Sequence, residues 1–159
     1  MKKRFFLRGL LFVVVLSGTA LCQELTVQSE SAKQALNRAD IEALPRLKVT
    51  ATEHSTPVNF EGVSIKSVLE KAGVGFGESM KGKRLASCLL VEAADGYRVV
   101  IALPELDPAF TDKQVILAFL KDGKPLGEKE GPYRIVIPGE KRMARWVRQV
   151  TALKIVEVP

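Results

Sequence analysis

The sequence is short of the residues from which many enzyme sites are built. Its 159 residues include two cysteines, one histidine and 6% aromatic residues. Two cysteines are too few for a disulfide-stapled mini-protein, and one histidine cannot build a multi-histidine metal site. The chain has no glycine-rich dinucleotide motif, no phosphate-binding loop, no Cys-x-x-Cys pair and no Gly-x-Ser-x-Gly motif. These absences argue against the common nucleotide-binding, dithiol-redox and serine-hydrolase classes.

The chain does contain enough apolar material for one substantial core. Hydrophobic residues make up 47% of it, and its length is typical of a single domain. No internal repeat, low-complexity tract or Pro/Gly-rich linker interrupts residues 24–159. We therefore expect residues 23–159 to form one domain.

Residues 1–22 predict a signal peptide. Three basic residues at positions 2–4 precede an uncharged, apolar run over 9–22. That run is shorter than the roughly 20 residues that cross a bilayer, and it has the length of a secretory signal. We expect cleavage after Ala20 or Cys22, in preference to a lipid anchor on Cys22 or an uncleaved anchor. The mature chain would then lie in the periplasm without a stable membrane span.

The positive charge of the chain is concentrated in this first segment. The formal net charge is +6, and removing the segment's four basic residues leaves +2. Because a nearly neutral mature chain offers no strongly basic platform, we expect no nucleic-acid partner. The mature domain keeps a single cysteine, Cys88, so it cannot form an internal disulfide.

The spacing of apolar residues predicts more strands than helices. Residues Val63–Ala72 carry apolar side chains at i, i+3, i+4 and i+7, which predicts an amphipathic helix that ends at Gly73. We also expect a polar helix over Ser29–Ala39 and a short turn N-capped by Asp40. Strands are expected over 25–28, 46–51, 85–93, 97–103, 115–120, 133–137 and 153–158. This order predicts an α+β fold with a β-rich mixed sheet or barrel-like core and a few short helices.

His54 and Cys88 are the two residues that could carry acid–base or thiol chemistry. His54 lies in the polar segment 52–56, which we expect to be a loop after a strand, where ligand-contacting groups are often presented. It is either a solvated residue hydrogen-bonded to Glu53 or Ser55, or a ligand or proton-transfer group. Cys88 lies within an apolar strand, where thiols usually pack as inert core residues.

The segment 140–148 is basic and contains the single tryptophan. Its arginines and its tryptophan are Arg142, Arg145, Arg148 and Trp146. Together with Arg134, they either form a guanidinium cluster for a phosphate or carboxylate, with Trp146 stacked on a ring, or make a solvated basic face with Trp146 half-buried.

Several blocks of the sequence resemble the oxidoreductase molybdopterin-binding domain, which has the sulfite-oxidase-like fold. Residues 60–73 are similar to the Gly-Val-x-Leu-x-x-Leu-Leu-x-x-Ala-Gly signature of that family, and 131–139 resemble its most recognisable block. Further similar blocks lie at 95–97, 104–106, 117–118, 122–126 and 145–146. The resemblance extends over about residues 40–158, and the order and spacing of the blocks make it specific.

The resemblance implies a β-rich α+β fold that holds a molybdenum–pterin cofactor for two-electron oxygen-atom transfer or reduction. Members of the family supply a cysteine thiolate to the metal from the loop after the strand equivalent to 48–52. This chain has Glu53 and His54 there and no cysteine. The Arg- and Asn-rich element that follows that cysteine is also missing. A lone imidazole or carboxylate does not replace a soft thiolate ligand.

Two functional hypotheses follow. In the first, the chain is a periplasmic molybdopterin-dependent oxidoreductase, with His54 as its catalytic residue and Arg134, Arg142 and Arg145 on the phosphate or pterin. In the second, it holds no cofactor and is a non-catalytic periplasmic module that binds a small anion or a protein partner. The binding pocket is then framed by His54, Tyr97, Arg134, Arg145 and Trp146.

Overall fold

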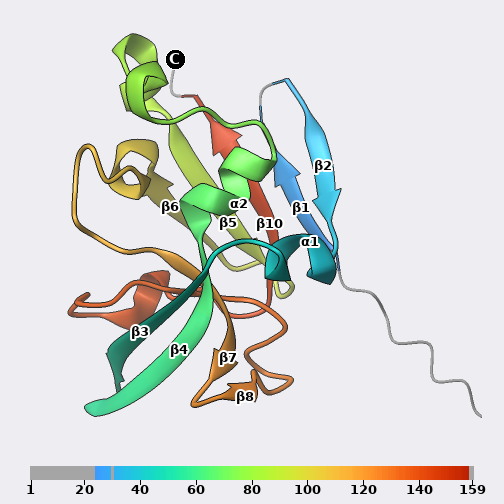
Figure 1. The fold of residues 1–159 in the computed structure, drawn as a ribbon. Helices are drawn as coiled ribbons and strands as arrows, with labels where there is room; N and C mark the ends of the chain where they lie inside the picture. The colour runs from blue at the N-terminus through green and yellow to red at the C-terminus, as the bar shows by residue number, and fades with distance from the viewer. Residues whose placement is uncertain (1–23, 30, 158–159) are drawn as a thin grey trace, which may run out of the picture.

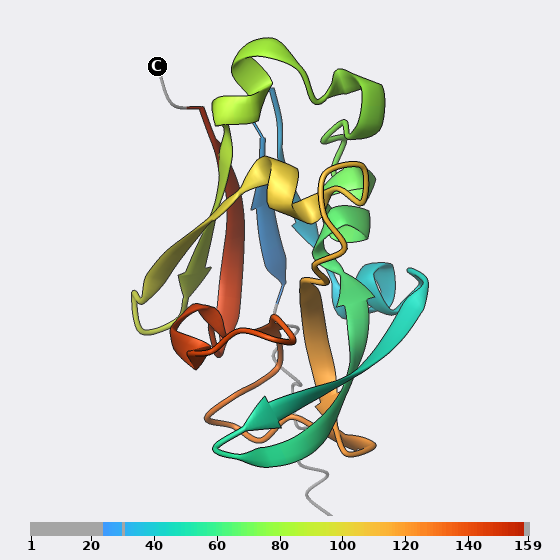
Figure 2. The same ribbon diagram turned by 90° about the vertical axis from the view of Figure 1, so that its left-hand side faces the viewer.

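Two β-sheets pack face to face and enclose the core (Figures 1 and 2). The computed structural model describes residues 24–29 and 31–157, so the expected signal peptide lies outside the described residues. The first sheet has the order β2-β1-β10-β5-β6, in which β1 runs parallel to β10 and the other neighbours are antiparallel. The second sheet has the order β3-β4-β7-β8, and β9 also pairs with β7. The predicted β-rich α+β fold is confirmed.

The strands of the first sheet are β1 (Leu25–Gln28), β2 (Lys33–Leu36), β5 (Cys88–Ala93), β6 (Arg98–Ala102) and β10 (Val150–Val156). Those of the second are β3 (Arg46–Glu53), β4 (Thr56–Ser64), β7 (Ile116–Lys121), β8 (Lys124–Pro125) and β9 (Arg134–Val136). The α-helices are α1 (Arg38–Glu42) and α2 (Ile65–Lys71). Short 3₁₀ turns are η1 (Gly77–Ser79), η2 (Gly82–Ala86), η3 (Leu103–Leu106) and η4 (Met143–Arg145). No helix of the described part is long and apolar enough to cross a membrane.

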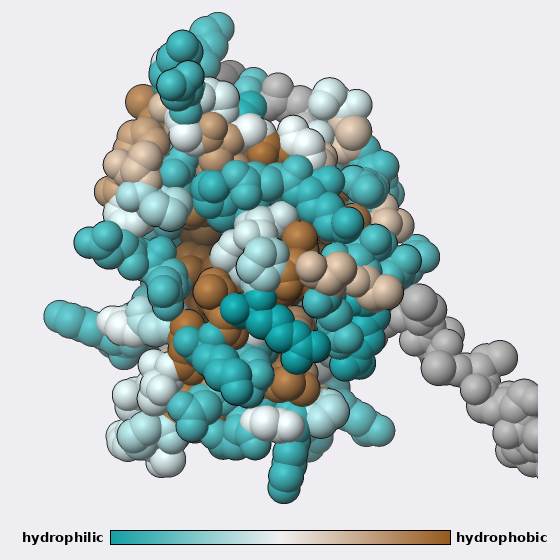
Figure 3. Space-filling view, in the orientation of Figure 1, coloured by the Kyte–Doolittle hydropathy of each residue, from teal (hydrophilic) through white to brown (hydrophobic). Residues whose placement is uncertain are grey.

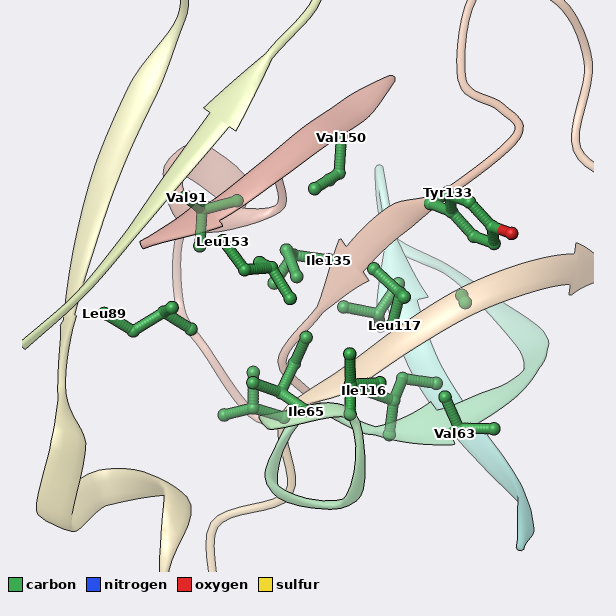
Figure 4. Close-up of a cluster of buried hydrophobic side chains, with 14 of the residues drawn as sticks. Val63, Ile65, Leu89, Val91, Ile116, Leu117, Tyr133, Ile135, Val150 and Leu153 are labelled. Carbon is green, nitrogen blue, oxygen red and sulfur yellow. The ribbon is translucent and has the colours of Figure 1, made fainter. Parts of the chain in front are cut away.

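The core is built from the inward faces of both sheets. Figure 4 shows Leu89, Val91 and Leu153 of the first sheet pointing toward Leu117 and Ile135 of the second. In β5 the side chains alternate between the core and the outer face, whereas Ile116–Phe119 of β7 and all of β9 are buried. The face drawn in Figure 3 is accordingly covered mostly by hydrophilic side chains.

The amphipathic helix expected over 63–72 is present as α2. Ser64 caps it, since the Ser64 hydroxyl accepts a hydrogen bond from the Ser67 N–H at 2.9 Å. Val68 and Leu69 are buried, as the apolar spacing predicts. The helix starts two residues later than expected because β4 continues through Ser64.

The helix expected over Ser29–Ala39 is wrong. Within this segment Lys33–Leu36 forms β2, which pairs antiparallel with β1, and the helix α1 begins only at Arg38. Asn37, not Asp40, is the N-cap, and Asp40 completes a reciprocal capping box as the third helical residue. Pairing with β1 here overrides the weak helical preference of a polar segment.

The polar segment around His54 is also not an open loop. β3 and β4 form a hairpin whose two turn residues, His54 and Ser55, have φ of 47° and 70°. Two positive φ values in a two-residue hairpin connection indicate a type I′ turn. β4 was not predicted from the sequence, because in its first half only Val58 and Phe60 are buried, between polar neighbours.

Gly62 of β4 lets this strand approach β7 closely. The register between the two strands shifts between Glu61 and Gly62. A Cβ atom added at Gly62 would lie 2.1 Å from the Leu117 carbonyl oxygen, which is backbone and cannot turn away.

We expect Gly62→Ala to lower the free energy of unfolding by about 1–3 kcal/mol, because β7 must shift to admit the methyl group. Urea denaturation of the folded protein measures the change. Gly127→Ala is the matched control, since a Cβ at Gly127 meets nothing within 4 Å. Equal stability of the two variants would contradict the close approach.

Candidate functional site

A network of four charged side chains lies where β3, β7 and β9 meet. Arg134 of β9 is only 1% exposed, and its guanidinium donates from Nη2 to Glu53 Oε1 at 2.7 Å and from Nη1 to Glu130 Oε1 at 2.8 Å. Lys121 at the end of β7 donates from Nζ to Glu53 Oε2 at 2.6 Å. Both oxygens of the buried Glu53 carboxylate are therefore paired with cations.

Aromatic rings form the apolar walls around Arg134. The guanidinium carbon lies 5.4 Å from the centroid of Phe60 and 5.5 Å from that of Trp146. These two rings meet edge to face at 6.0 Å, and the Trp146 indole N–H donates to the Ile137 carbonyl oxygen at 3.1 Å. Ring faces attract a cation, so they help to offset the cost of removing Arg134 from water.

The pKa of Glu53 lies below its usual value. Burial raises the pKa of this carboxyl. The hydrogen bonds from Lys121 and Arg134 and the charges of both cations lower it by more than burial raises it. The carboxylate is thus held in its charged form by its partners.

Next to this network lies an open pocket of about 350 Å³. The β5–β6 turn, the loop before β9, η4 and the loop before β10 contribute to its walls, and Figure 2 shows η4 beside the β5–β6 turn. The lining residues are Ala93, Asp95, Tyr97, Lys129, Arg134, Met143, Ala144, Trp146, Val147, Arg148 and Gln149. Three of these side chains are cationic and one is a carboxylate.

A hydrogen bond joins two walls of the pocket. The Tyr97 hydroxyl, at the start of β6, donates to the Ala144 carbonyl oxygen in η4 at 2.8 Å. Gln149 fixes the neighbouring loop, because its side-chain amide donates to the Glu128 carbonyl oxygen at 2.7 Å. The pocket is therefore framed by segments that contact one another directly.

The structure brings together three of the six predicted site residues. Tyr97, Arg134 and Trp146 line the same pocket. Trp146 is buried, not half-buried as on a solvated basic face. His54 is exposed on the β3–β4 turn and does not line the pocket.

Arg142 and Arg145 also lie outside the pocket lining. Arg142 is exposed just before η4. Arg145 pairs with Glu140 and lies 3.6 Å from Glu105, so its guanidinium is directed to carboxylates of this chain. Arg148, the third arginine of the basic segment, does reach the pocket.

The carboxylates that pair with Arg134 were not among the predicted site residues. One signal was available for Glu53, since the inward residues of β3 are Val49, Ala51 and Glu53 at alternating positions. A second was Arg134 itself, an arginine inside an apolar strand, which requires a buried partner. Glu130 and Lys129 lie in a loop and carry no such pattern.

A comparison with protein-family models identifies the fold. The oxidoreductase molybdopterin-binding domain matches residues 23–159. The chain belongs to this family. A comparison with curated proteins gave no significant match. The family resemblance inferred from the sequence blocks is confirmed, and the family's defining ligand is molybdopterin.

The donors of this molybdopterin-binding domain do not fit a thiolate-ligated molybdenum centre. Cys88, the cysteine of the described region, is half-buried in β5 opposite Ala102 and outside the pocket lining. The described residues contain no group of three His, Cys, Asp or Glu side chains placed to hold a metal ion. The cationic lining matches an anionic group, and it contains no thiolate ligand for a metal.

We expect Glu53→Gln to lower the free energy of unfolding by about 1–3 kcal/mol at neutral pH, because it leaves the buried Arg134 with one carboxylate partner, Glu130, in place of two. Chemical denaturation measures the loss. Glu70→Gln is the control, since it removes one partner of an exposed pair with Lys66, and such a pair contributes less than about 1 kcal/mol.

The same variant changes the response to acid. The pKa of Glu53 is lower in the folded protein than its unfolded value near 4.5. The contribution of Glu53 to the free energy of unfolding is therefore fully present above the unfolded pKa, and it is lost as pH falls through the folded pKa. Glu53→Gln should therefore lose less stability on acidification than the wild type. The variant should still lose some stability in acid, since the N–H groups of Gly77 and Ala109 lower the pKa of Asp107 too. Identical acid profiles for wild type and variant would contradict the assignment.

Proposed function

We propose that this molybdopterin-binding domain is a periplasmic binding module whose pocket takes a small, flat organic anion without ligating molybdenum. The observation that carries the proposal is the pocket itself, which combines three cations and two aromatic residues with no cysteine. The periplasmic location rests on the basic and apolar pattern of residues 1–22.

The rim of the pocket supplies the groups that recognise the anion. Lys129 is exposed, and Arg148 Nε lies 4.0 Å from Glu130 Oε1, too far for a hydrogen bond. Both cations are therefore able to turn toward a ligand and form charge-assisted hydrogen bonds with a carboxylate or phosphate. Arg134 contributes positive potential from the floor, while its two terminal nitrogens stay on Glu53 and Glu130.

The flat part of the ligand is recognised by apolar surface. Tyr97 is 48% exposed while its hydroxyl is held by Ala144, so the ring is fixed and its surface is accessible. Met143 is also part of the lining. A volume of about 350 Å³ suits a single heterocycle with one anionic group rather than a large cofactor.

The competing function is a cofactor-loaded oxidoreductase with His54 at its centre. It requires His54 to reach the pocket, although the β3–β4 turn holds this residue outside the lining. A module that binds a periplasmic protein partner is a third function, for which Tyr97 and Arg148 are the accessible contacts.

We expect pterin-6-carboxylate to raise the melting temperature of the protein more than inorganic phosphate does, because it offers a flat ring as well as a charge. Arg148→Ala should weaken its binding about tenfold, which equals one lost charge-assisted hydrogen bond. Isothermal titration calorimetry measures both affinities.

Lys83→Ala is the matched control, because it removes an exposed cation of η2 that does not line the pocket. Its affinity should equal that of the wild type. Absence of any thermal shift with either probe, or equal weakening in the two variants, would contradict a binding pocket at this place.

A further inference from the structure

β6 is an open edge of the first sheet. It is the last strand in the order β2-β1-β10-β5-β6, and in Figure 2 it forms the left margin of the ribbon with no strand beyond it. Its partner is β5, with Glu92 opposite Arg98, Leu90 opposite Val100 and Cys88 opposite Ala102. The other side of β6 pairs with no described strand.

The direction of the backbone groups of β6 follows from two flanking hydrogen bonds. The Ala93 N–H donates to the Tyr97 carbonyl oxygen, and the Leu103 N–H donates to the Ser87 carbonyl oxygen, both at 2.9 Å. In an antiparallel pair, alternate residues bond to the neighbour and the residues between them point away. The N–H and C=O groups of Arg98, Val100 and Ala102 therefore face outward, as three donors and three acceptors in a row.

The other edges of the two sheets are protected in ways that β6 is not. β2 is four residues long and carries the exposed Lys33, β8 has two residues, and β3 carries the exposed Arg46 and Lys48. Charged side chains and short length prevent edge-to-edge pairing. On β6 the central outward residue is Val100, which is 54% exposed, and its only charge is Arg98 at one end.

We propose that β6 pairs antiparallel with β6 of a second copy of this chain, about a twofold axis through Val100. The two five-stranded sheets then join into one sheet of ten strands. This inference does not depend on the proposed ligand of the pocket.

The sequence of β6 favours its own copy as the partner. Centred on Val100, the pairing sets Arg98 opposite the second copy's Ala102 and Val100 opposite the second copy's Val100. All three outward residues then find partners at once. A register centred on Arg98 would set two arginines opposite each other, which is unfavourable, and would leave Ala102 unpaired.

Side chains on the outer face support the same register. Val100 lies beside Leu90 of β5, which is half-buried, so the pairing creates a continuous apolar row of Leu90, Val100 and their two counterparts. Tyr97 directly precedes β6 and lines the pocket, so each pocket lies at one end of the shared edge.

Sedimentation velocity of the purified protein, over micromolar to submillimolar concentration, tests the proposal. The wild type should shift from monomer to dimer with increasing concentration. Val100→Lys should weaken association at least about tenfold, because two ammonium groups then lie opposite each other. Its circular dichroism spectrum and melting temperature verify that the variant is folded.

Val156→Lys is the matched control, since Val156 is a 40%-exposed valine on β10, two strands away from the edge. It should associate as the wild type does. Amide exchange adds a second readout: the N–H groups of Arg98, Val100 and Ala102 should gain protection as concentration rises.

Three results would overturn the proposal. The first is a monomer at every concentration. The second is equal loss of association in the two lysine variants, which would indicate contact through the outer face of the sheet. The third is a dimer whose β6 edge amides stay unprotected.

Discussion

The buried ion pair between Arg134 and Glu53 is the constraint on which the arrangement of this domain depends. A guanidinium can be excluded from water only if carboxylates and ring faces surround it, and here Glu53, Glu130, Phe60 and Trp146 do so. These residues come from β3, β4, the loop before β9 and the segment after η4. The pair therefore connects one end of the second sheet to the segments that form the pocket.

The same pair limits what the pocket can recognise. Two nitrogens of Arg134 are committed to carboxylates of the chain itself, so a ligand anion has to be bound by the rim cations Lys129 and Arg148. Cys88 lies on β5 outside this lining. The chain has the fold of its family, while the pocket is lined by cationic and aromatic side chains and by no cysteine. This is the basis for proposing a binding module.

The sequence predicted the elements whose pattern is local and regular. The helix α2 and the strands β1, β3, β7 and β10 follow from apolar spacing, and the family follows from the order of short blocks. Polar strands whose formation depends on pairing were missed, such as β2, which is mostly exposed and pairs with β1. Tyr97, Arg134 and Trp146 do converge, but no pattern along the chain relates Glu53 to Arg134, which are 81 residues apart. His54 was expected in an open loop because the polar residues at the start of β4 gave no strand pattern, so the β3–β4 hairpin was not predicted.

The most direct test of the proposal that this domain does not ligate molybdenum is the metal and pterin content of the protein purified from a periplasm. The host should load a known molybdenum enzyme expressed beside it, so that cofactor supply is established. Elemental analysis, together with pterin fluorescence after denaturation and oxidation, then measures both components. A pocket that lacks a thiolate ligand predicts neither molybdenum nor molybdopterin in stoichiometric amount. Stoichiometric molybdenum with its pterin would contradict the binding-module account and make His54→Ala the next variant to examine.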